Sequence, residues 1–321
     1  ILSVHLRMMS SYLPITDDWA MNNIENNVKN QFRSQILAES PNLPSNALDK
    51  EVNERWQEFY TQNKEQIEVQ KKQSSNQYIS WFKNDEGQTY LPDIDSYFYF
   101  LKTRNVFDHG HPGDTLKDGR PWNSLTQPPH GRPAEQNTHQ WFGAFFGYIM
   151  SFFGLGLMAS FFLTPVIISS LSAIPAFFIC RRLVGNVGGF FAALVVNVHA
   201  VYISRTPGGG TDTDMYNVFL PLMIMWIFIE SLESDNLRNK LSLGALTGFL
   251  IAVYSYTWTG WWYIFDIILA GGVGFLIYHI ITHIKEQKVS LFSSPNFKNE
   301  VFSILMFIFS SLVFITLLSG F

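Results

Sequence analysis

The residues best suited to chemistry lie in a glycine-rich segment, Gly208-Gly-Gly-Thr-Asp212-Thr-Asp214-Met. It carries two carboxylates, Asp212 and Asp214, two positions apart. Hard divalent cations such as Mg²⁺ and Mn²⁺ prefer oxygen ligands, and they commonly retain waters or take phosphate oxygens of a substrate. Glycine and aspartate are also common in solvated turns. The pattern therefore predicts either a simple turn or a divalent metal site.

A second acidic motif, Leu91-Pro-Asp93-Ile-Asp95-Ser-Tyr, precedes an aromatic stretch that predicts a helix beginning near Asp95. Asp95 is suited to capping that helix. Taken alone, Asp95 is best explained as that cap; binding a cation together with Asp212 and Asp214 becomes an alternative because all three are predicted on one face of a membrane. The two readings differ in what they expect of the Asp95 side chain.

One further motif suits an anionic ligand, and one tryptophan falls at a predicted membrane boundary. Pro128-Pro-His130-Gly-Arg132-Pro is a rigid turn with an imidazole and a guanidinium, which bind anions by charge and by forked hydrogen bonds. Trp258 falls at a predicted membrane boundary, where aromatic side chains are also common for reasons of solvation alone. His130 and Arg132 are therefore candidates for anion binding, and Trp258 has an ordinary explanation as well.

The elements that must position these residues are mostly membrane helices. The chain is 47% hydrophobic and only 15% charged, and residues 15–140 are polar whereas residues 141–321 are almost uninterruptedly apolar. A helix needs about 20 apolar residues to cross ~30 Å of hydrocarbon. Six runs qualify as predicted spans: Leu157–Ile179, Val187–Ile203, Tyr216–Leu232, Leu241–Tyr256, Trp261–Ile281 and Val301–Phe321. Trp141–Gly156 is also apolar, but it is short and glycine-rich.

The charges of the loops predict which face each segment occupies, because cytoplasmic loops collect Lys and Arg. The loops at 204–215 and 257–260 contain a single basic residue, Arg205. The alternate loops are basic, with Arg181, Arg182, Arg238, Lys240, Lys285, Lys288 and Lys298. This pattern favours residues 15–140 and 204–215 together on the outer face. If Trp141–Gly156 were a separate crossing, the two acidic motifs would lie on opposite faces.

The expected organisation has three parts: the end of a first transmembrane helix at 1–14, a large external loop at 15–140, and a truncated transmembrane bundle at 141–321. Inside the loop, Ala47–Lys72 has an apolar residue every fourth position and predicts an amphipathic helix. Pro112–Pro133 is rich in proline and glycine and predicts an irregular loop.

The two acidic motifs, Asp95-Ser-Tyr-Phe-Tyr and Gly-Thr-Asp212-Thr-Asp214-Met, together resemble the outer-loop motifs of the oligosaccharyltransferase catalytic subunit in its single-subunit form. Residues 105–133 look most like the archaeal AglB members of that family, which is related to bacterial PglB. The resemblance implies an all-α polytopic membrane protein with a GT-C-type transmembrane helix bundle and a large first outer loop. It also implies a C-terminal soluble domain, which we expect to be absent from this chain.

By this resemblance the protein transfers a glycan from a polyprenyl (dolichol) phosphate or pyrophosphate carrier to Asn in Asn-X-Ser/Thr. Asp95, Asp212 and Asp214 would then be catalytic residues and ligands of Mn²⁺ or Mg²⁺. His130, Arg132 and Trp258 would bind the donor phosphates. The implied partners are a lipid-linked oligosaccharide, an acceptor polypeptide and membrane lipids; no basic run in the sequence suggests nucleic acid. The implied location is an archaeal cell membrane, with the active site on the outer face.

The chain departs from the family pattern in one respect. A later acidic residue and a Trp-Trp-Asp motif that reads the acceptor Ser or Thr do not occur, and Trp261-Trp-Tyr263 is not that motif. We therefore expect residues 1–321 to be inactive by themselves.

Two alternatives remain open from the sequence. One is another GT-C glycosyltransferase that uses a lipid-phosphate sugar, such as a protein O-mannosyltransferase. The other is a cation-coupled transporter, which would need ionisable residues within its spans. Asp266 and Glu230 are the carboxylates that fall in or near the predicted spans, and they give this alternative little support.

Overall fold

The computed structural model describes residues 1–285 and 295–319, so the predicted loop cation Lys288 and the terminal Phe321 lie outside the described residues. The chain forms two compact units. One comprises Met9–Tyr90, and the other comprises Ile1–Met8 with Leu91–Phe321. The boundary falls inside helix α1 (Leu2–Tyr12). This division does not test which segments face outward, and the expected membrane boundaries remain predictions.

The smaller unit is built from three helices: α2 (Ile15–Glu39), α3 (Ser45–Gln62) and α4 (Lys64–Trp81). The single helix predicted over Ala47–Lys72 is therefore two helices, interrupted at Asn63. Its predicted apolar face is confirmed, because Leu48, Val52 and Trp56 are all buried. Four-residue spacing identified the face that packs, but nothing in that spacing marks the break.

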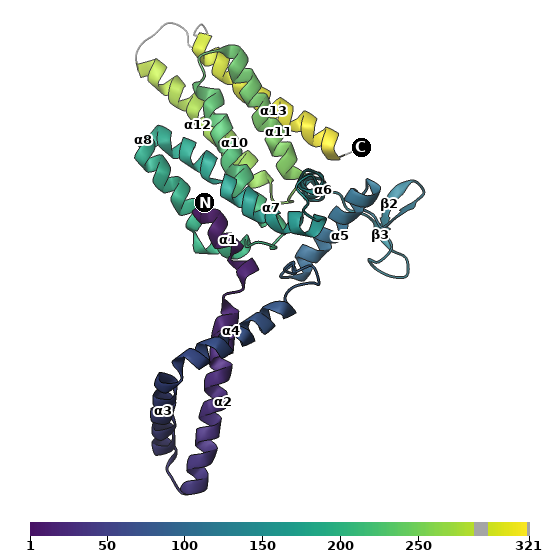
Figure 1. Cartoon of the computed structure of the whole chain (residues 1–321). Coiled ribbons are helices and arrows are strands. Elements are labelled where there is room, and N and C mark those ends of the chain that lie inside the picture. Colours follow the sequence, from purple (N-terminus) through teal and green to yellow (C-terminus); the bar gives the residue numbers. More distant parts are fainter. Residues whose placement is uncertain (286–294, 320–321) are drawn as a thin grey trace. The chain divides into compact units, whose positions relative to one another are not determined.

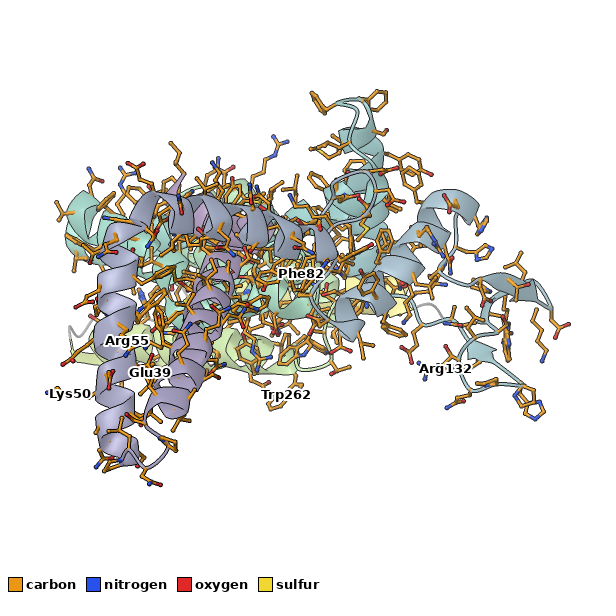
Figure 2. All side chains as sticks on the ribbon, turned by 60° about the horizontal axis from the view of Figure 1, so that its bottom comes forward. Glu39, Lys50, Arg55, Phe82, Arg132 and Trp262 are labelled. Atoms are coloured by element: carbon orange, nitrogen blue, oxygen red, sulfur yellow. The ribbon has the colours of Figure 1, made fainter. Side chains whose placement is uncertain are left out.

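Packing rather than charge holds the smaller unit together. Ile24 of α2, Trp56 of α3 and Ile67 of α4 form one apolar cluster. Arg55 of α3 also pairs with Glu39 of α2 at 3.5 Å, and Figure 2 shows these two side chains on neighbouring helices. Such solvent-exposed pairs add little to stability, because water screens the charges and two long side chains lose conformational freedom. The buried apolar residues therefore dominate the stability of this unit.

The larger unit contains the remaining elements, which are mostly helical. In chain order they are α5 (Ile94–His109), β1 (Thr115–Lys117), β2 (Arg120–Asn123), β3 (Arg132–Pro133), α6 (Thr138–Ser151), α7 (Leu157–Leu171), α8 (Ala173–Val198), α9 (Ala200–Arg205), the 3₁₀ turn η1 (Thr213–Met215), α10 (Tyr216–Glu233), α11 (Leu237–Ser255), α12 (Trp262–Lys285) and α13 (Pro295–Ser319).

The segment predicted as an irregular loop, Pro112–Pro133, contains a small antiparallel sheet of order β1-β2-β3. Asp118 and Gly119 connect β1 to β2 and have φ values of 52° and 74°. Two consecutive residues with positive φ form the tight hairpin turn whose twist matches that of the strands, and Asp-Gly is a favoured pair for it. The irregular-loop prediction is wrong here because this dipeptide was not read as a hairpin signal.

Four helical stretches in the described part of the chain are long and apolar enough to cross a membrane: Leu157–Val198, Thr213–Glu233, Trp262–Thr282 and Phe297–Leu318. The first combines two spans predicted separately. It is kinked at Val184 and at Gly185, which has a φ of 78°. The stretch predicted at Leu241–Tyr256 forms α11, which is not among the four.

Contacts at the two ends of the bundle define which loops lie together. At one end, Arg182 near the α8 kink donates to Glu230 of α10, with Nε 3.1 Å from Oε1. At the other end, the Thr138 N–H at the start of α6 donates to the Tyr256 carbonyl after α11 at 3.1 Å. The Gly209 N–H donates to the Phe162 carbonyl of α7 at 2.9 Å. The beginning of α7 thus returns to the loop that carries Asp212.

The core of the larger unit is centred on α10, with side chains from α7, α11, α12 and α13 around it. Figure 1 shows α10, α11 and α13 running side by side. Apolar side chains gain little by leaving lipid, so membrane helices associate through close packing, which small residues at the interface allow. Gly248 of α11 provides such a contact, because a Cβ there would lie 2.7 Å from the Phe307 carbonyl of α13.

We predict that Gly248→Ala destabilises the bundle by about 1–3 kcal/mol, because the added methyl group overlaps the α13 backbone. Gly271→Ala is the matched control, since a Cβ at this position in α12 meets nothing within 4 Å. The control should be neutral or slightly stabilising, as Ala favours helix over Gly by up to about 1 kcal/mol. Thermal unfolding of the purified full-length protein in detergent compares them. Equal unfolding temperatures for the two variants would contradict close packing at Gly248.

Candidate active site

The first acidic motif is organised by the N-terminus of α5, and the residue that caps the helix is Asp93. Its Oδ1 accepts a hydrogen bond from the Ser96 N–H at 2.7 Å. The capping role considered for Asp95 is therefore wrong. Asp95 lies in the first turn with an exposed side chain, and it makes no hydrogen bond or ion pair within residues 1–285 and 295–319. Its carboxylate remains available to a ligand.

The loop before the second motif is fixed from several sides. The Gly208 N–H donates to the Arg7 carbonyl of α1 at 2.8 Å, and Arg7 Nε donates to Thr206 Oγ1 at 2.9 Å. Gly209 has a φ of 83°, and a Cβ there would lie 2.7 Å from the Phe162 ring. Both the backbone conformation and the available space therefore require glycine at position 209. The loop is held in one path toward Asp212.

The two acidic motifs meet through Thr211. Its N–H donates to Ser96 Oγ at 3.0 Å, and its carbonyl is 2.8 Å from His139 Nε2 of α6. Ser96 directly follows Asp95, and Thr211 directly precedes Asp212. The arrangement in which Trp141–Gly156 separates these motifs is therefore wrong, and the prediction that they share one end of the bundle is confirmed.

Asp212 and Asp214 point to different partners. Asp212 Oδ1 accepts from the Thr213 N–H at 2.5 Å and so caps η1. Asp214 Oδ1 accepts from Asn217 Nδ2 at 3.4 Å, and its Oδ2 lies 3.9 Å from Arg205 Nη1. Asp214, Asn217 and Arg205 line a cavity of about 440 Å³. Asp214 therefore has a positive partner beside this cavity, whereas Asp212 is oriented by the backbone N–H and the hydroxyl of the next residue, Thr213.

Tyr99 lies one helical turn after Asp95, and carboxylates of both motifs influence its pKa. Burial raises the pKa of its phenol, and the negative charges of Asp212 and Asp95 raise that pKa further. The phenol therefore stays protonated at neutral pH and can serve as a hydrogen-bond donor. Full burial also lowers the pKa of His139 to about 4, although the Thr211 carbonyl and Asp212 act in the opposite direction. His139 is consequently neutral at neutral pH.

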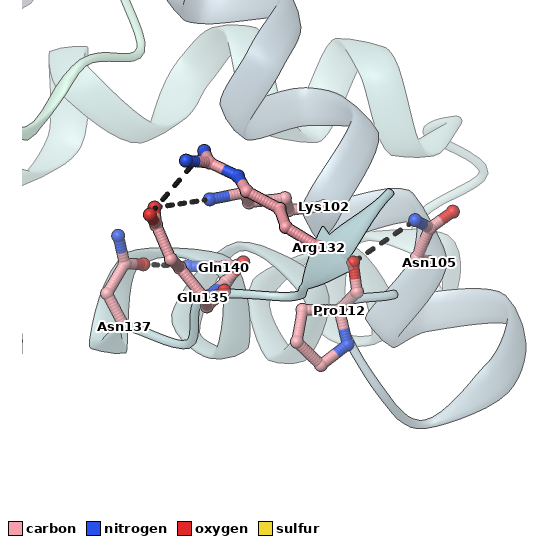
Figure 3. Close-up of polar contacts among 7 residues, drawn as sticks. All are labelled: Lys102, Asn105, Pro112, Arg132, Glu135, Asn137 and Gln140. Carbon is pink, nitrogen blue, oxygen red and sulfur yellow. Dashed lines mark hydrogen bonds and ion pairs between the residues drawn. The ribbon is translucent and has the colours of Figure 1, made fainter. Parts of the chain in front are cut away.

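The structure places Arg132 in a cluster of three charged residues (Figure 3). Glu135 Oε1 lies 3.4 Å from Arg132 Nη2, and Glu135 Oε2 lies 3.4 Å from Nζ of Lys102 in α5. Burial lowers the pKa of Lys102, while Glu135 acts to raise it. His130 lies in the preceding turn, where its carbonyl accepts from Trp122 Nε1 at 3.2 Å. The turn predicted to bind an anion thus contains a cation, Arg132, that already has a carboxylate counter-ion.

Trp258 is linked to the second motif through two intermediates. Its ring stacks on Tyr254, with centroids 5.9 Å apart. Tyr254 donates its hydroxyl proton to Asn217 Oδ1 at 3.1 Å, and Asn217 in turn donates to Asp214. A purely lipid-facing tryptophan needs no such connection. Trp258 is thus connected to Asp214 through Tyr254 and Asn217, and its role as a donor contact stays a prediction.

The carboxylates near Thr211 are of a type that a hard divalent cation takes as ligands, but in the described part of the chain they are not arranged as a site for one. Asp95 and Asp212 supply carboxylate oxygens, the ligand type that Mg²⁺ and Mn²⁺ prefer. Within the described residues, no three His, Cys, Asp or Glu side chains are arranged as a group that can hold a metal ion. Thr211 Oγ1 is a buried oxygen beside the site that makes no hydrogen bond in the described structure.

Sequence reasoning did not identify Ser96, Tyr99, His139 or Asn217. A signal was available for Tyr99 and Asn217, which lie four and three residues after Asp95 and Asp214 and so share a helical face with them. No local pattern marks His139, because its importance depends on contacts with residues more than 70 positions away.

The sequence of the chain matches that of a known protein family. Residues 66–321 match the family model for the N-terminal part of the oligosaccharyl transferase STT3. The chain belongs to this family. The matched family is described as one of oligosaccharyl transferases, and not of transporters.

The relatives of this STT3-family chain are archaeal and bacterial. A dolichyl-phosphooligosaccharide-protein glycotransferase of Methanococcus voltae is 30% identical over 239 residues, covering 71% of this chain and 26% of the relative. One of Methanocaldococcus jannaschii is 24% identical, covering 74% of this chain and 34% of the relative. The chain therefore spans about a quarter to a third of the length of these relatives.

Solved structures of the Archaeoglobus fulgidus oligosaccharyltransferase support the fold. Its complex with an inhibitory peptide and a dolichol-phosphate superposes with a TM-score of 0.52 at 16% identity, covering 70% of this chain and 25% of the other. The likeness confirms the predicted all-α GT-C-type architecture. With the apolar helices, it identifies the chain as part of an integral membrane protein.

The different structural roles of Asp93 and Asp95 give a direct test. We predict that Asp93→Ala lowers the free energy of unfolding by about 0.5–2 kcal/mol, because it removes the α5 cap. Asp95→Ala should leave stability unchanged within about 0.5 kcal/mol, since no described contact is lost. Chemical or thermal unfolding of the full-length protein measures both. A larger loss for Asp95→Ala would show that Asp95 has a structural role.

Proposed function

We propose that the protein to which this chain belongs is a metal-dependent oligosaccharyltransferase. It transfers a glycan from a polyprenyl phosphate or pyrophosphate carrier to the side-chain amide nitrogen of Asn in Asn-X-Ser/Thr. The observation that carries the proposal is the hydrogen bond from the Thr211 N–H to Ser96 Oγ, which joins the two acidic motifs in a chain of the STT3 family.

Solved structures of a relative support the proposed partners. One Archaeoglobus fulgidus structure holds a dolichol-phosphate and a peptide, and another is tethered to an acceptor peptide with the NVT sequon. A third is a complex with Zn and sulfate. We infer the same classes of ligand for this protein: a lipid-linked donor, a sequon peptide and a divalent cation, here Mn²⁺ or Mg²⁺. We also propose an archaeal cell membrane as its location, with this site on the outer face.

In this proposal Asp95, Asp212 and Asp214 would hold the cation once their carboxylates converge on it, an arrangement that the described residues do not show. When bound, the cation offsets the negative charge that develops on the departing lipid phosphate. Asp95 is exposed and uncommitted, so its carboxylate can accept N–H hydrogen bonds from the acceptor amide and weaken its conjugation. The amide nitrogen attacks the anomeric carbon, the bond from that carbon to the phosphate oxygen breaks, and the nitrogen loses a proton to a carboxylate.

The donor side of the proposed site consists of His130, Arg132 and Trp258. The guanidinium of Arg132 suits phosphate oxygens, and a donor phosphate would compete with Glu135 for it. Trp258 lies at the end of the Tyr254–Asn217–Asp214 chain and would contact the donor beside the acidic loop. Tyr99 keeps its proton and can donate a hydrogen bond toward either acidic motif.

We predict Mn²⁺-dependent transfer by the full-length protein to a fluorescent peptide containing Asn-X-Thr, with a lipid-linked glycan extract as donor. EDTA should abolish transfer, and Asp95→Asn and Asp212→Asn should each lower it by about 10²-fold or more, the size of effect seen when one charge-stabilising group is removed. The control is Asp118→Asn, an exposed carboxylate in the β1–β2 turn, which should leave the rate unchanged. Transfer that survives both site substitutions would contradict the proposed site.

A further inference from the structure

Helix α6 carries its small residues inward and its large apolar ones outward. Gly143, Ala144 and Gly147 are on its buried face. A Cβ at position 143 would lie 2.8 Å from the Phe161 ring of α7, and one at position 147 would overlap Leu157. The opposite face and the turn after the helix form an exposed surface, here called the α6 apolar face: Trp141, Phe145, Tyr148, Ile149, Phe152 and Phe153. A helix in water buries its large apolar side chains, so this reversal indicates an apolar environment outside α6.

The α6 apolar face is continuous and carries no charge. Its members within the helix recur every three or four residues, so they form one stripe along α6. Phe152 and Phe153 are 89% and 75% exposed in the turn that Gly154 closes with a φ of 77°. The sequence has no Asp, Glu, Lys or Arg from position 138 to 156. Proteins in water rarely expose such an apolar patch unless something binds it.

Contacts place the start of α6 beside the first residues of a membrane helix. The stretch Thr213–Glu233 is one of those long and apolar enough to cross a membrane. His139 of α6 has its Nε2 2.8 Å from the carbonyl of Thr211, just before that stretch. Its Nδ1 lies 3.1 Å from the hydroxyl of Tyr216, at the beginning of α10. The α6 apolar face therefore adjoins the end of the bundle at which this stretch begins.

The length and direction of α6 do not suit a membrane crossing. With 14 residues it is about 21 Å long, which is shorter than the ~30 Å of hydrocarbon. The chain also turns back after it, because Phe161 of α7 packs against His139 with ring centroids 5.1 Å apart. Figure 1 shows α6 nearly end-on, whereas α10, α11 and α13 run lengthwise in the same view. The helix thus lies across the bundle and next to the acidic loop.

We propose that the α6 apolar face is a lipid-contact surface, with α6 lying in the plane of the membrane interface at the end of the bundle that carries the acidic motifs. Trp and Tyr are enriched at such interfaces, and Phe suits the acyl chains below. The Tyr148 hydroxyl donates to the Phe107 carbonyl at 2.5 Å, so the protein satisfies its polar end while part of its ring is exposed.

The partner is the acyl-chain and glycerol region of the bilayer, bound by apolar contact. An uncharged surface has no means of selecting a headgroup by its charge, so anionic lipids should offer no advantage over neutral ones. The inference goes beyond the proposed function, because contact with lipid does not require glycan transfer.

The test uses the full-length protein in nanodiscs of dioleoylphosphatidylcholine, with one nitroxide label on one introduced cysteine in a background without other cysteines. Phe145→Cys and Phe152→Cys place labels seven residues apart on the α6 apolar face. Phe302→Cys and Phe309→Cys are the matched pair on α13, since they have the same spacing and also replace exposed phenylalanines. Asp118→Cys, in the exposed β1–β2 turn, is the reference for water.

The depth of each label follows from its collisions with O₂, which concentrates in hydrocarbon, and with a water-soluble nickel chelate. We expect both α6 labels to favour O₂, as the α13 labels should, whereas the label at position 118 should favour the chelate. Seven residues advance ~10 Å along a helix. The α6 labels should nevertheless lie within about 3 Å of the same depth, because their helix lies in the membrane plane. Position 309, nearer the middle of its span, should be about 6 Å deeper than position 302.

Three results would overturn the inference. Preference of the α6 labels for the nickel chelate would show that this face lies in water. Exclusion of both reagents would show that protein, and not lipid, covers the face. Depths that differ by ~10 Å between positions 145 and 152 would show that α6 runs across the hydrocarbon. Unchanged unfolding temperatures check that the labelled variants are folded, and Phe153→Cys, also at an exposed position, replaces Phe152→Cys if that variant does not fold.

Discussion

The peptide groups around Thr211 connect the first acidic motif, the second acidic motif and α6. The Thr211 N–H faces Ser96 and its carbonyl faces His139, so three separate segments of sequence depend on one residue of a glycine-rich loop. Buried amides must find partners, and here those partners come from helices rather than from the loop itself. The geometry of the carboxylates consequently follows from how α5 and α6 pack, and changes in that packing would reach Asp212.

The need to hold the loop around Thr211 in place also accounts for the surrounding sequence. Gly209 adopts a positive φ and sits against Phe162, so the loop approaches α7 as closely as a backbone can. Asp93 caps α5, which frees Asp95 from a structural role and leaves it exposed. Glu135 balances Arg132 and the buried Lys102 next to the site. The cap of α5 and the proposed ligand Asp95 are thus different residues, whereas Asp212 both caps η1 and is a proposed ligand.

Much of this arrangement was predictable from periodicity and loop charge. The apolar runs located α10, α12 and α13, and the absence of lysine around Asp212 placed that residue at the same end as Asp95. The cap on α5 was assigned to the wrong aspartate, because Asp93 and Asp95 both precede a helical stretch and only backbone geometry distinguishes them. The Asp118-Gly119 hairpin carried a recognisable signal that was missed. His139 carried none, since its contacts are entirely tertiary.

A double-mutant cycle on Mn²⁺ affinity tests most directly whether Asp95 and Asp212 bind one cation, as proposed. Calorimetry on the full-length protein would compare Asp95→Asn, Asp212→Asn and the double variant, with unfolding temperatures confirming that each is folded. A shared ion predicts strong coupling, so that the double variant binds Mn²⁺ hardly more weakly than either single variant. Strictly additive losses, or an Asp95→Asn variant with unchanged affinity, would contradict a common site.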